Sequence, residues 1–184
     1  MRNLLVGMAA LAVAGTALGA VHSYPGANGS AAVVGSIGYI NPNEVGYFWS
    51  VSRGDSVTET FADGLPFVTQ TRLDLNVIQN VLNSGNSVNW DVLLNGTLIG
   101  SFSVAQGFLG PVTHVLNHAA VAHVGGMYTV RMEVTNEVPG GGGSHTWLAG
   151  APAGAIGSTV TLVPAPASLA LLGLGGLVAG RRRR

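Results

Sequence analysis

Residues Val88–Val104, "VNWDVLLNGTLIGSFSV", have the pattern of a β-hairpin, and this hairpin is the clearest structural signal in the chain. Apolar and polar residues alternate on both sides of Asn95-Gly96, a pattern typical of strands with one buried face. Asn-Gly is the preferred dipeptide for a two-residue type I′ turn, because both positions need a positive φ angle. A hairpin closed there has three cross-strand pairs: Leu94 with Thr97, Leu93 with Leu98, and Val92 with Ile99. A tryptophan that alternates with aliphatic residues is usually a core residue, so we assign Trp90 to the core.

The second arm of this hairpin loses its alternation near Gly100. Counting from the turn places Phe102 on the face opposite to Trp90. A β-bulge at Gly100 would return Phe102 to the Trp90 side, and glycine is the residue that tolerates a bulge most easily. We therefore expect a bulge at this glycine.

The surrounding sequence also predicts strands. Period-two alternation is clear in Thr69–Val77 and Met127–Val138, and further strands are expected at Tyr47–Val51, Ser56–Phe61 and Gly157–Val163. Turn-forming residues separate these runs at Asn41–Asn43, Asp63–Pro66, Asn83–Asn86 and Pro139–Gly143. Short strands at such spacing predict an all-β protein, a single antiparallel β-sandwich or jelly-roll-like domain.

The charges of the chain are unevenly distributed. Arg2 and Arg181–Arg184 lie at the two ends, which leaves three arginines in the body against all eight acidic residues, a net charge of −5. Lysine and cysteine are absent. An acidic body with scattered arginines has no patch that could neutralise phosphates, so nucleic acid is not an expected partner. Without cysteine, no disulfide stabilises the fold.

The N-terminus has the pattern of a secretory signal. Arg2 is followed by the apolar run Leu4–Ala14 and by the small residues of Ala17–Ala20. Together they predict export and removal by signal peptidase, with cleavage after Gly19 or after Ala20. We therefore divide the chain into a signal peptide with a helical core at 1–20, a β-sandwich domain at 21–162, and a C-terminal tail at 163–184.

Three histidines, His114, His118 and His123, are candidates for a metal site. On a helix the first two would share a face at i and i+4. In a strand they also share a face, but ~13 Å apart, which is too far to share an ion. No cysteine is present and no acidic residue lies within this stretch, so we expect edge or surface histidines and neither a metal nor another cofactor.

The two ends of the chain carry clear signals for localisation, whereas the body carries no clear signal for function. Three tryptophans and neighbouring tyrosines could form a sugar-stacking platform, and Trp147, beside a glycine-rich loop, is the best candidate for a ligand contact. A carbohydrate-binding module is therefore one alternative. No nucleophile elbow or thiol nucleophile is present, so no catalytic activity is expected. A secreted hydrolase remains a second alternative, which a converging acid–acid or acid–histidine pair in a pocket would favour.

The tail at 163–184 consists of three parts in a fixed order. Val163-Pro164-Ala165-Pro166 is followed by the uncharged run Ser168–Gly180 and by Arg181–Arg184. As a helix, the thirteen residues of this run extend ~20 Å, which is less than the ~30 Å of a bilayer's hydrocarbon core. Arginine side chains can reach the interface and the bilayer can thin, so insertion in a membrane is still possible. A simple stop-transfer anchor with the arginines on the cytoplasmic side is one alternative.

This arrangement resembles the PEP-CTERM sorting signal of Gram-negative bacteria. The residues that carry the resemblance are Val163, Pro164, Ala165, Pro166, Arg181, Arg182, Arg183 and Arg184, and Ala165 replaces the usual glutamate. The resemblance implies a hydrophobic helix held transiently in the membrane and an exosortase-like membrane protease or transpeptidase that processes it. It also implies a cell-surface or extracellular location and an association with exopolysaccharide and biofilm matrix. The sequence thus predicts an exported, exosortase-sorted matrix protein without catalytic activity.

Overall fold

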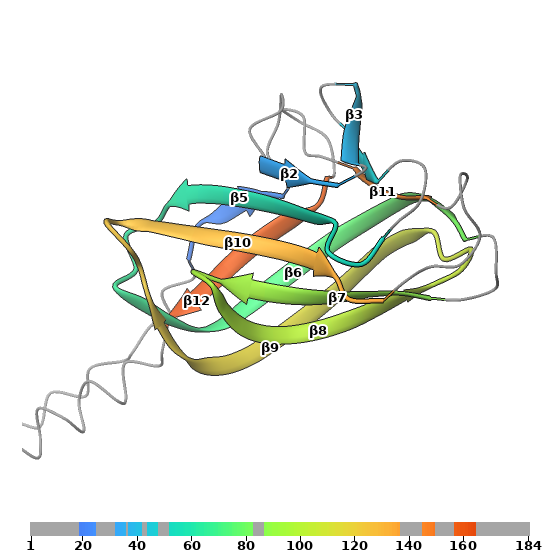
Figure 1. The fold of residues 1–184 in the computed structure, drawn as a ribbon. Helices are drawn as coiled ribbons and strands as arrows, with labels where there is room; N and C mark the ends of the chain where they lie inside the picture. The colour runs from blue at the N-terminus through green and yellow to red at the C-terminus, as the bar shows by residue number, and fades with distance from the viewer. Residues whose placement is uncertain are drawn as a thin grey trace, which may run out of the picture. The chain divides into compact units, whose positions relative to one another are not determined.

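The computed structural model describes residues 19–24, 32–35, 37–41, 44–47, 52–82, 87–136, 145–149 and 157–164. In these segments the chain forms two antiparallel sheets that pack face to face (Figure 1). The predicted all-β sandwich is therefore confirmed. Residues 1–18 of the signal segment and the run Ser168–Gly180, with the helices predicted in them, lie outside the described residues. No helix long and apolar enough to cross a membrane occurs in the segments described.

The first sheet, called sheet A, is built around the fifteen-residue strand β6 (Phe67–Val81). One side of β6 pairs with β9 (Gly110–Ala122), and the other side pairs with β12 (Thr159–Pro164) and then with β11 (His145–Ala149). β1 (Val21–Ser23) extends the sheet beyond β12, and β4 (Glu44–Tyr47) followed by β3 (Ile37–Asn41) extends it beyond β11.

The second sheet, called sheet B, has five strands in the order β2-β5-β10-β7-β8. Their bounds are β2 (Ala32–Val34), β5 (Ser56–Ala62), β10 (Met127–Val134), β7 (Ser87–Leu94) and β8 (Thr97–Ala105). In β7 and β10 every second side chain is buried against sheet A, because successive side chains of a strand point to opposite faces.

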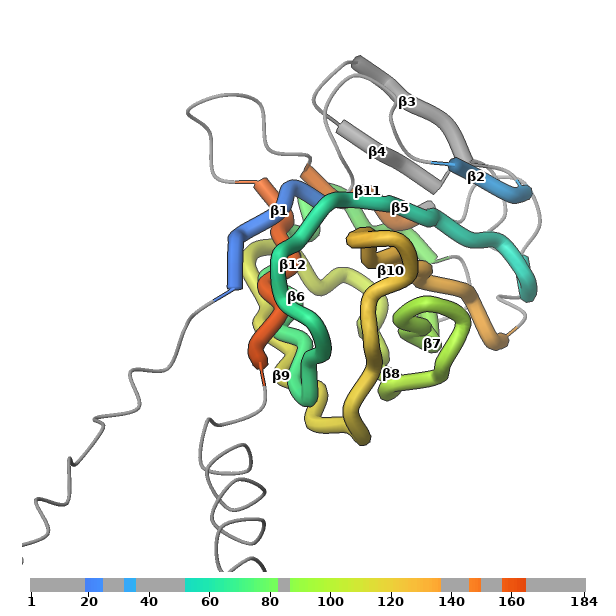
Figure 2. Tube along the Cα trace, turned by 90° about the vertical axis from the view of Figure 1, so that its left-hand side faces the viewer, coloured from blue at the N-terminus to red at the C-terminus, as the bar shows by residue number. Residues whose placement is uncertain are grey.

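The core lies between the sheets, and Figure 2 shows the strands of both sheets around it. Its largest fully buried side chains are Trp90, Tyr24, Tyr128, Leu73, Leu75, Leu82, Leu94, Met132 and Leu162. Tyr24 connects the sheets: its hydroxyl donates to the Val57 carbonyl at 2.9 Å and accepts from the Met132 N–H at 3.1 Å. Burial raises the pKa of Tyr24, so this hydroxyl stays protonated and able to donate.

The central hairpin forms as the sequence predicts. Asn95 and Gly96 have φ angles of 48° and 78°, both positive as a type I′ turn requires. Leu94 pairs with Thr97 and Leu93 with Leu98, but Val92 pairs with Gly100, not with Ile99. That shift is the expected bulge, and it places Phe102 opposite Trp90 in the core.

Glycine also suits position 100 because the edge of sheet A approaches it there. A Cβ atom on Gly100 would lie 2.8 Å from Leu116 Cδ2 of β9. The bulge therefore occurs where β8 meets β9 and the two sheets touch along one edge of the sandwich.

Most of the other predicted strands are confirmed, with adjusted ends. Thr69–Val77 lies within β6, Ser56–Phe61 within β5, and the strand expected from Met127 ends at Val134. The Asp63–Pro66 turn joins β5 to β6. Of Tyr47–Val51 only Tyr47 is described, at the end of β4, and the predicted turns at 42–43, 83–86 and 139–143 lie outside the described residues. The segment that contains His114 and His118 is strand β9, not a helix.

The last strand extends further than the sequence suggests. β12 includes Val163 and Pro164, which pair with Gln70 and Val68 of β6. The sandwich therefore continues beyond residue 162 and includes the first two residues of the predicted sorting motif. The described strands β1 to β12 all belong to one compact unit.

We expect Trp90→Ala to lower the free energy of unfolding by about 3–5 kcal/mol, because it removes a large side chain that is only 1% exposed. Urea unfolding of residues 19–165, followed by circular dichroism, measures this change. Leu98→Ala is the control, since Leu98 is 56% exposed and its truncation should change stability by less than about 0.5 kcal/mol. Equal losses in the two variants would show that the ring of Trp90 is not part of the core.

Candidate functional site

The outer face of sheet A carries mostly polar side chains. β6 contributes Gln70, Arg72, Asp74 and Asn76, whose neighbours in sequence point into the core. The register aligns them with side chains of β9 and β12 in three rows: Val163–Gln70–Asn117, Thr161–Arg72–Val115 and Thr159–Asp74–Thr113. Neighbouring strands lie ~4.8 Å apart, and successive rows along β6 lie ~6.6 Å apart. Seven of these nine positions carry a hydrogen-bonding side chain, and the other two are Val163 and Val115.

Arg72 and Asp74 are the charged pair at the centre of this face. The Arg72 guanidinium donates twice to the Asp74 carboxylate, from Nε at 2.7 Å and from Nη2 at 2.9 Å. Thr113 Oγ1 donates to the same carboxylate at 2.6 Å. These hydrogen bonds, that from Arg72 above all, hold the pKa of Asp74 below its usual value. Both side chains remain accessible, 52% and 35% exposed, so they can also contact a ligand.

Amide and hydroxyl groups surround this pair. Gln70 Nε2 donates to Asn117 Oδ1 at 2.7 Å, which leaves the other amide atoms of both side chains available to a ligand. Thr159 and Thr161 of β12 are half-buried on the same face. The face thus combines donors and acceptors, and sugar hydroxyl groups need both.

Trp147 lies on the outer face of the same sheet. Its neighbours in β11, Thr146 and Leu148, are buried at 1% and 4% exposure, so the alternation of the strand directs Trp147 outward. It pairs with Gln79 of β6 on one side and with Gly46 of β4 on the other. The indole is half-buried. The ligand contact predicted for Trp147 remains a prediction, and the structure provides it with a polar surface on the same face.

The histidines occupy different environments. His114 stacks on Phe102 with ring centroids 4.2 Å apart, and Phe102 stacks in turn on Trp90. His118 is hydrogen-bonded through Nε2 to Thr71 Oγ1 at 3.0 Å, whereas His123 Nδ1 accepts from the Gly126 N–H. No group of three His, Cys, Asp or Glu side chains that could hold a metal ion occurs among the residues described.

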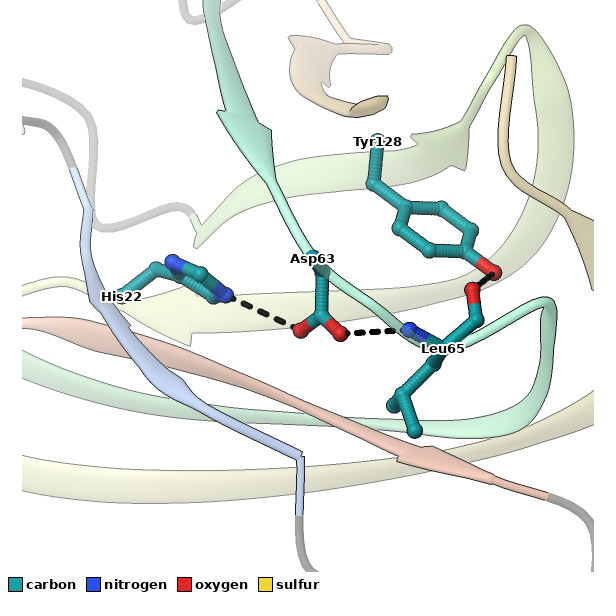
Figure 3. A network of polar contacts seen from close by, with 4 residues as sticks. All are labelled: His22, Asp63, Leu65 and Tyr128. Carbon is teal, nitrogen blue, oxygen red and sulfur yellow. Dashed lines mark hydrogen bonds and ion pairs between the residues drawn. The ribbon is translucent and has the colours of Figure 1, made fainter. Parts of the chain in front are cut away.

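A further histidine, His22, forms the acid–histidine pair that sequence reasoning did not find. Its Nε2 lies 3.1 Å from Asp63 Oδ2, and its ring stacks on Phe61 at 4.0 Å. Figure 3 shows the His22 ring and the Asp63 carboxylate pointing toward each other, with the other carboxylate oxygen accepting from the Leu65 N–H at 3.0 Å. β1 and β5 lie about forty residues apart in sequence, and the short run "VHS" has no local signal that predicts this contact.

This pair is part of a structural network. The Tyr128 hydroxyl donates to the Leu65 carbonyl at 3.0 Å (Figure 3). Burial, and secondarily the charge of Asp63, raise the pKa of Tyr128, which keeps it a donor. The network connects β1 to the end of β5.

A shallow groove of about 330 Å³ lies where β9 passes the β7–β8 turn. Its lining is mostly small and apolar: Asn95, Thr97, Leu98, His118, Ala119, Ala120, Val121, Ala122 and Val124. Asn95 uses both its amide groups internally, donating to the Ala122 carbonyl and accepting from the Thr129 N–H. The groove therefore offers few free polar groups to orient a small ligand.

Comparison with known proteins shows similarity of fold alone. No family model and no curated protein matches the chain. The CBM36-1 domain of a multidomain xylanase from the hindgut metagenome of Trinervitermes trinervoides is 16% identical over 80% of this chain and 98% of that domain, with a TM-score of 0.47. CsCBM6-3 from Clostridium stercorarium, in complex with cellobiose, is 13% identical over 79% of this chain and 94% of that one, with a TM-score of 0.43.

A third similar structure belongs to a longer protein. It is a family two carbohydrate esterase from Clostridium thermocellum in complex with cellohexaose, 14% identical over 74% of this chain but only 33% of the esterase, with a TM-score of 0.42. At these identities and TM-scores the similarity assigns no family, ligand or activity to this chain.

Of the predicted sorting residues, Val163 and Pro164 lie in β12. Ala165, Pro166 and Arg181–Arg184 lie outside the described residues. The sorting signal therefore remains a prediction from the sequence.

We expect His114 to make stability depend on pH. Burial lowers its pKa, and its Nε2 is buried with no hydrogen-bond partner among the described residues. The unfolded chain therefore binds a proton more readily, so the stability linked to His114 is complete above the unfolded pKa of about 6.5 and is lost as pH falls toward the folded value. His114→Phe keeps the stack on Phe102 and should reduce the loss of stability between neutral and mildly acidic pH. Urea midpoints measured at both pH values test this, and an unchanged pH dependence in the variant would contradict it.

Proposed function

We propose that this chain is an exported carbohydrate-binding protein of the cell envelope, without catalytic activity of its own, and that its ligand is an extended polysaccharide. The observation that carries the proposal is the outer face of sheet A, where Trp147, the Arg72–Asp74 pair and the Gln70–Asn117 pair share one surface. The names of the similar structures agree with this ligand class, but the proposal rests on the face itself.

The shape of this face suits a long ligand better than a small one. A small molecule is usually held in a concave pocket that buries most of its surface, whereas this face is the outside of a sheet. An extended chain can instead collect many weak contacts along the strands. An aromatic ring offers a flat apolar surface to a sugar ring, and the arginine, carboxylate and amide groups offer hydrogen bonds to its hydroxyls.

The outer face of sheet B supports this choice by comparison. It carries a similar ion pair, Arg131 with Glu133 at 2.8 Å, and hydrogen bonds such as Ser101 Oγ to Asp91 at 2.6 Å. The described strands of sheet B direct no aromatic side chain outward. Sugar stacking requires an outward-facing aromatic ring, and of the two faces it is that of sheet A that carries one, Trp147, in the described segments. The outer face of sheet B therefore serves as a control surface within the same protein.

The ends of the chain support export and sorting. The N-terminal pattern is that of a secretory signal, and the tail is similar to signals processed by an exosortase-like enzyme. Under this proposal signal peptidase and the exosortase-like enzyme are processing partners, the membrane holds the tail transiently, and exopolysaccharide outside the cell is the ligand.

We expect Trp147→Ala and Asp74→Asn each to weaken polysaccharide binding at least tenfold, equivalent to about 1.4 kcal/mol. Affinity electrophoresis in gels that contain candidate polysaccharides, including exopolysaccharide of the native host, measures this loss. Glu133→Gln is the matched control, because it removes the corresponding carboxylate from the outer face of sheet B. Equal retardation of all three variants, or no retardation of the parent by any polysaccharide, would reject this face as the site.

The sorting proposal predicts that surface-exposed protein begins near Ala20 or Val21 and lacks Arg181–Arg184. Replacing these arginines with lysines should preserve processing, because charge sets the topological stop, whereas serines should let some unprocessed protein pass the membrane. Intact mass of the surface fraction and a blot of membrane and released fractions measure both effects. Recovery of surface protein that still carries Arg184 would leave a simple anchor as the explanation.

A further inference from the structure

One end of the sandwich is close to the point where both terminal segments join it. Gly19 lies so close to β12 that a Cβ atom there would overlap the carbonyl of Leu162. β12 itself ends at Pro164, opposite Val68 at the start of β6. The same end contains the starts of β6 and β10 and the ends of β5 and β9, because Phe67 pairs with Ala122 and Met127 pairs with Ala62.

Five large apolar side chains are exposed at this end, which we call the apolar end. They are Val21, Phe67, Leu98, Val124 and Met127, with exposed fractions of 67%, 45%, 56%, 70% and 37%. Val124 forms a bridge with Met127 at the β9–β10 turn, and Val124 and Leu98 line the groove described above. Exposed apolar side chains that gather in this way usually mark a contact with a partner or a membrane.

The apolar end carries very little charge. The segments that form it, residues 19–22, 62–67, 95–98, 119–128 and 163–164, contain no lysine or arginine and a single acidic residue, Asp63. The Asp63 side chain is only 4% exposed and is paired with His22. A body with a net charge of −5 thus keeps its accessible carboxylates away from this end. Such an end can approach an anionic lipid surface without the repulsion that exposed carboxylates would cause.

The length of chain between the sandwich and the tail restricts what can lie beside the apolar end. Only Ala165, Pro166 and Ala167 separate Pro164, which is paired in β12, from Ser168 at the start of the uncharged run. Even a fully extended backbone spans at most ~14 Å over these four steps. While the tail is inserted in a bilayer, the apolar end is therefore held at the membrane interface.

From these observations we propose that the apolar end of the sandwich docks on the lipid bilayer. The inference rests on the membrane-inserted tail of the proposed function and adds a second contact to it. The exposed side chains of the apolar end enter the interfacial region, where burial of apolar side chains is favourable. The polar outer face of sheet A runs up from this contact, since β6 begins at the apolar end. The sandwich is then held upright with its polysaccharide face accessible from the side.

The absence of cysteine from the chain makes a direct test possible. Single-cysteine variants of the tail-bearing protein are reconstituted into vesicles of phosphatidylethanolamine and phosphatidylglycerol and treated with a membrane-impermeant maleimide. Val124→Cys probes the apolar end, and Leu109→Cys, in the loop at the other end of β8 and β9, is the control with a similar exposure of 60% against 70%. We expect Val124→Cys to react at least about tenfold more slowly than Leu109→Cys in vesicles, and the two rates to converge in urea.

A second variant distinguishes docking on the lipid from mere proximity to the membrane imposed by the short connection to the tail. About twenty Gly and Ser residues inserted after Ala165 give the sandwich a flexible leash long enough to leave the surface. Slow labelling of Val124→Cys that persists with this insertion supports docking, and labelling at the Leu109→Cys rate overturns it. Flotation of the vesicles reports tail insertion independently: protein that floats but lacks protection rejects the docking alone, and protein that does not float rejects both the docking and the membrane-sorted tail.

Discussion

Strand β6 is paired along both of its sides, and this double pairing holds sheet A together. Along one side it is hydrogen-bonded to β9, and along the other to β12 and β11 in succession. A single strand thereby joins the middle of the chain to its last strands, and through β12 to the first strand β1. Buried residues alternate along β6 with the polar residues of the outer face. The core and the proposed ligand surface are therefore opposite faces of one strand, and a one-residue slip in register would exchange them.

Local chemistry is what the sequence predicted well. The Asn95-Gly96 turn, the pairs next to it, the bulge and the burial of Trp90 all follow from residues within seventeen positions. Turn geometry and side-chain alternation act over such distances, so they leave a readable pattern. The secondary structure of β9 was harder to predict, because the spacing of its histidines fits both a helix and a strand. Its pairing with β6 is what shows that it is a strand. The actual partner lies about forty residues away, and no local feature specifies it.

The contacts that close the sandwich were not predictable for the same reason. β1 has three residues, and its pairing with β12 spans almost the whole body. The His22–Asp63 contact and the two hydrogen bonds of Tyr24 exist only because this short strand is placed beside both sheets. Trp147 is intermediate: a ligand contact was predicted for it from the glycine-rich sequence beside it, whereas the strand that directs its half-buried indole outward includes a register shift next to it. The candidate site thus combines one residue chosen from the sequence with a polar grid that only the register of β6, β9 and β12 assembles.

The overlap of β12 with the predicted sorting motif relates folding to processing. An enzyme that takes an extended Val163–Pro166 segment has to detach Val163 and Pro164 from β6. The physical cost of this detachment is small for two reasons. Proline has no N–H group, so Pro164 donates nothing to the ladder, and the register already shifts between Val163 and Pro164, where the pairing is irregular. Val160 and Leu162, by contrast, are fully buried and hold the strand behind this point. The chain can therefore release Val163 and Pro164 from β6 while the rest of β12 stays in the sheet. This release would allow one short segment to be both the end of a strand and part of a processing signal.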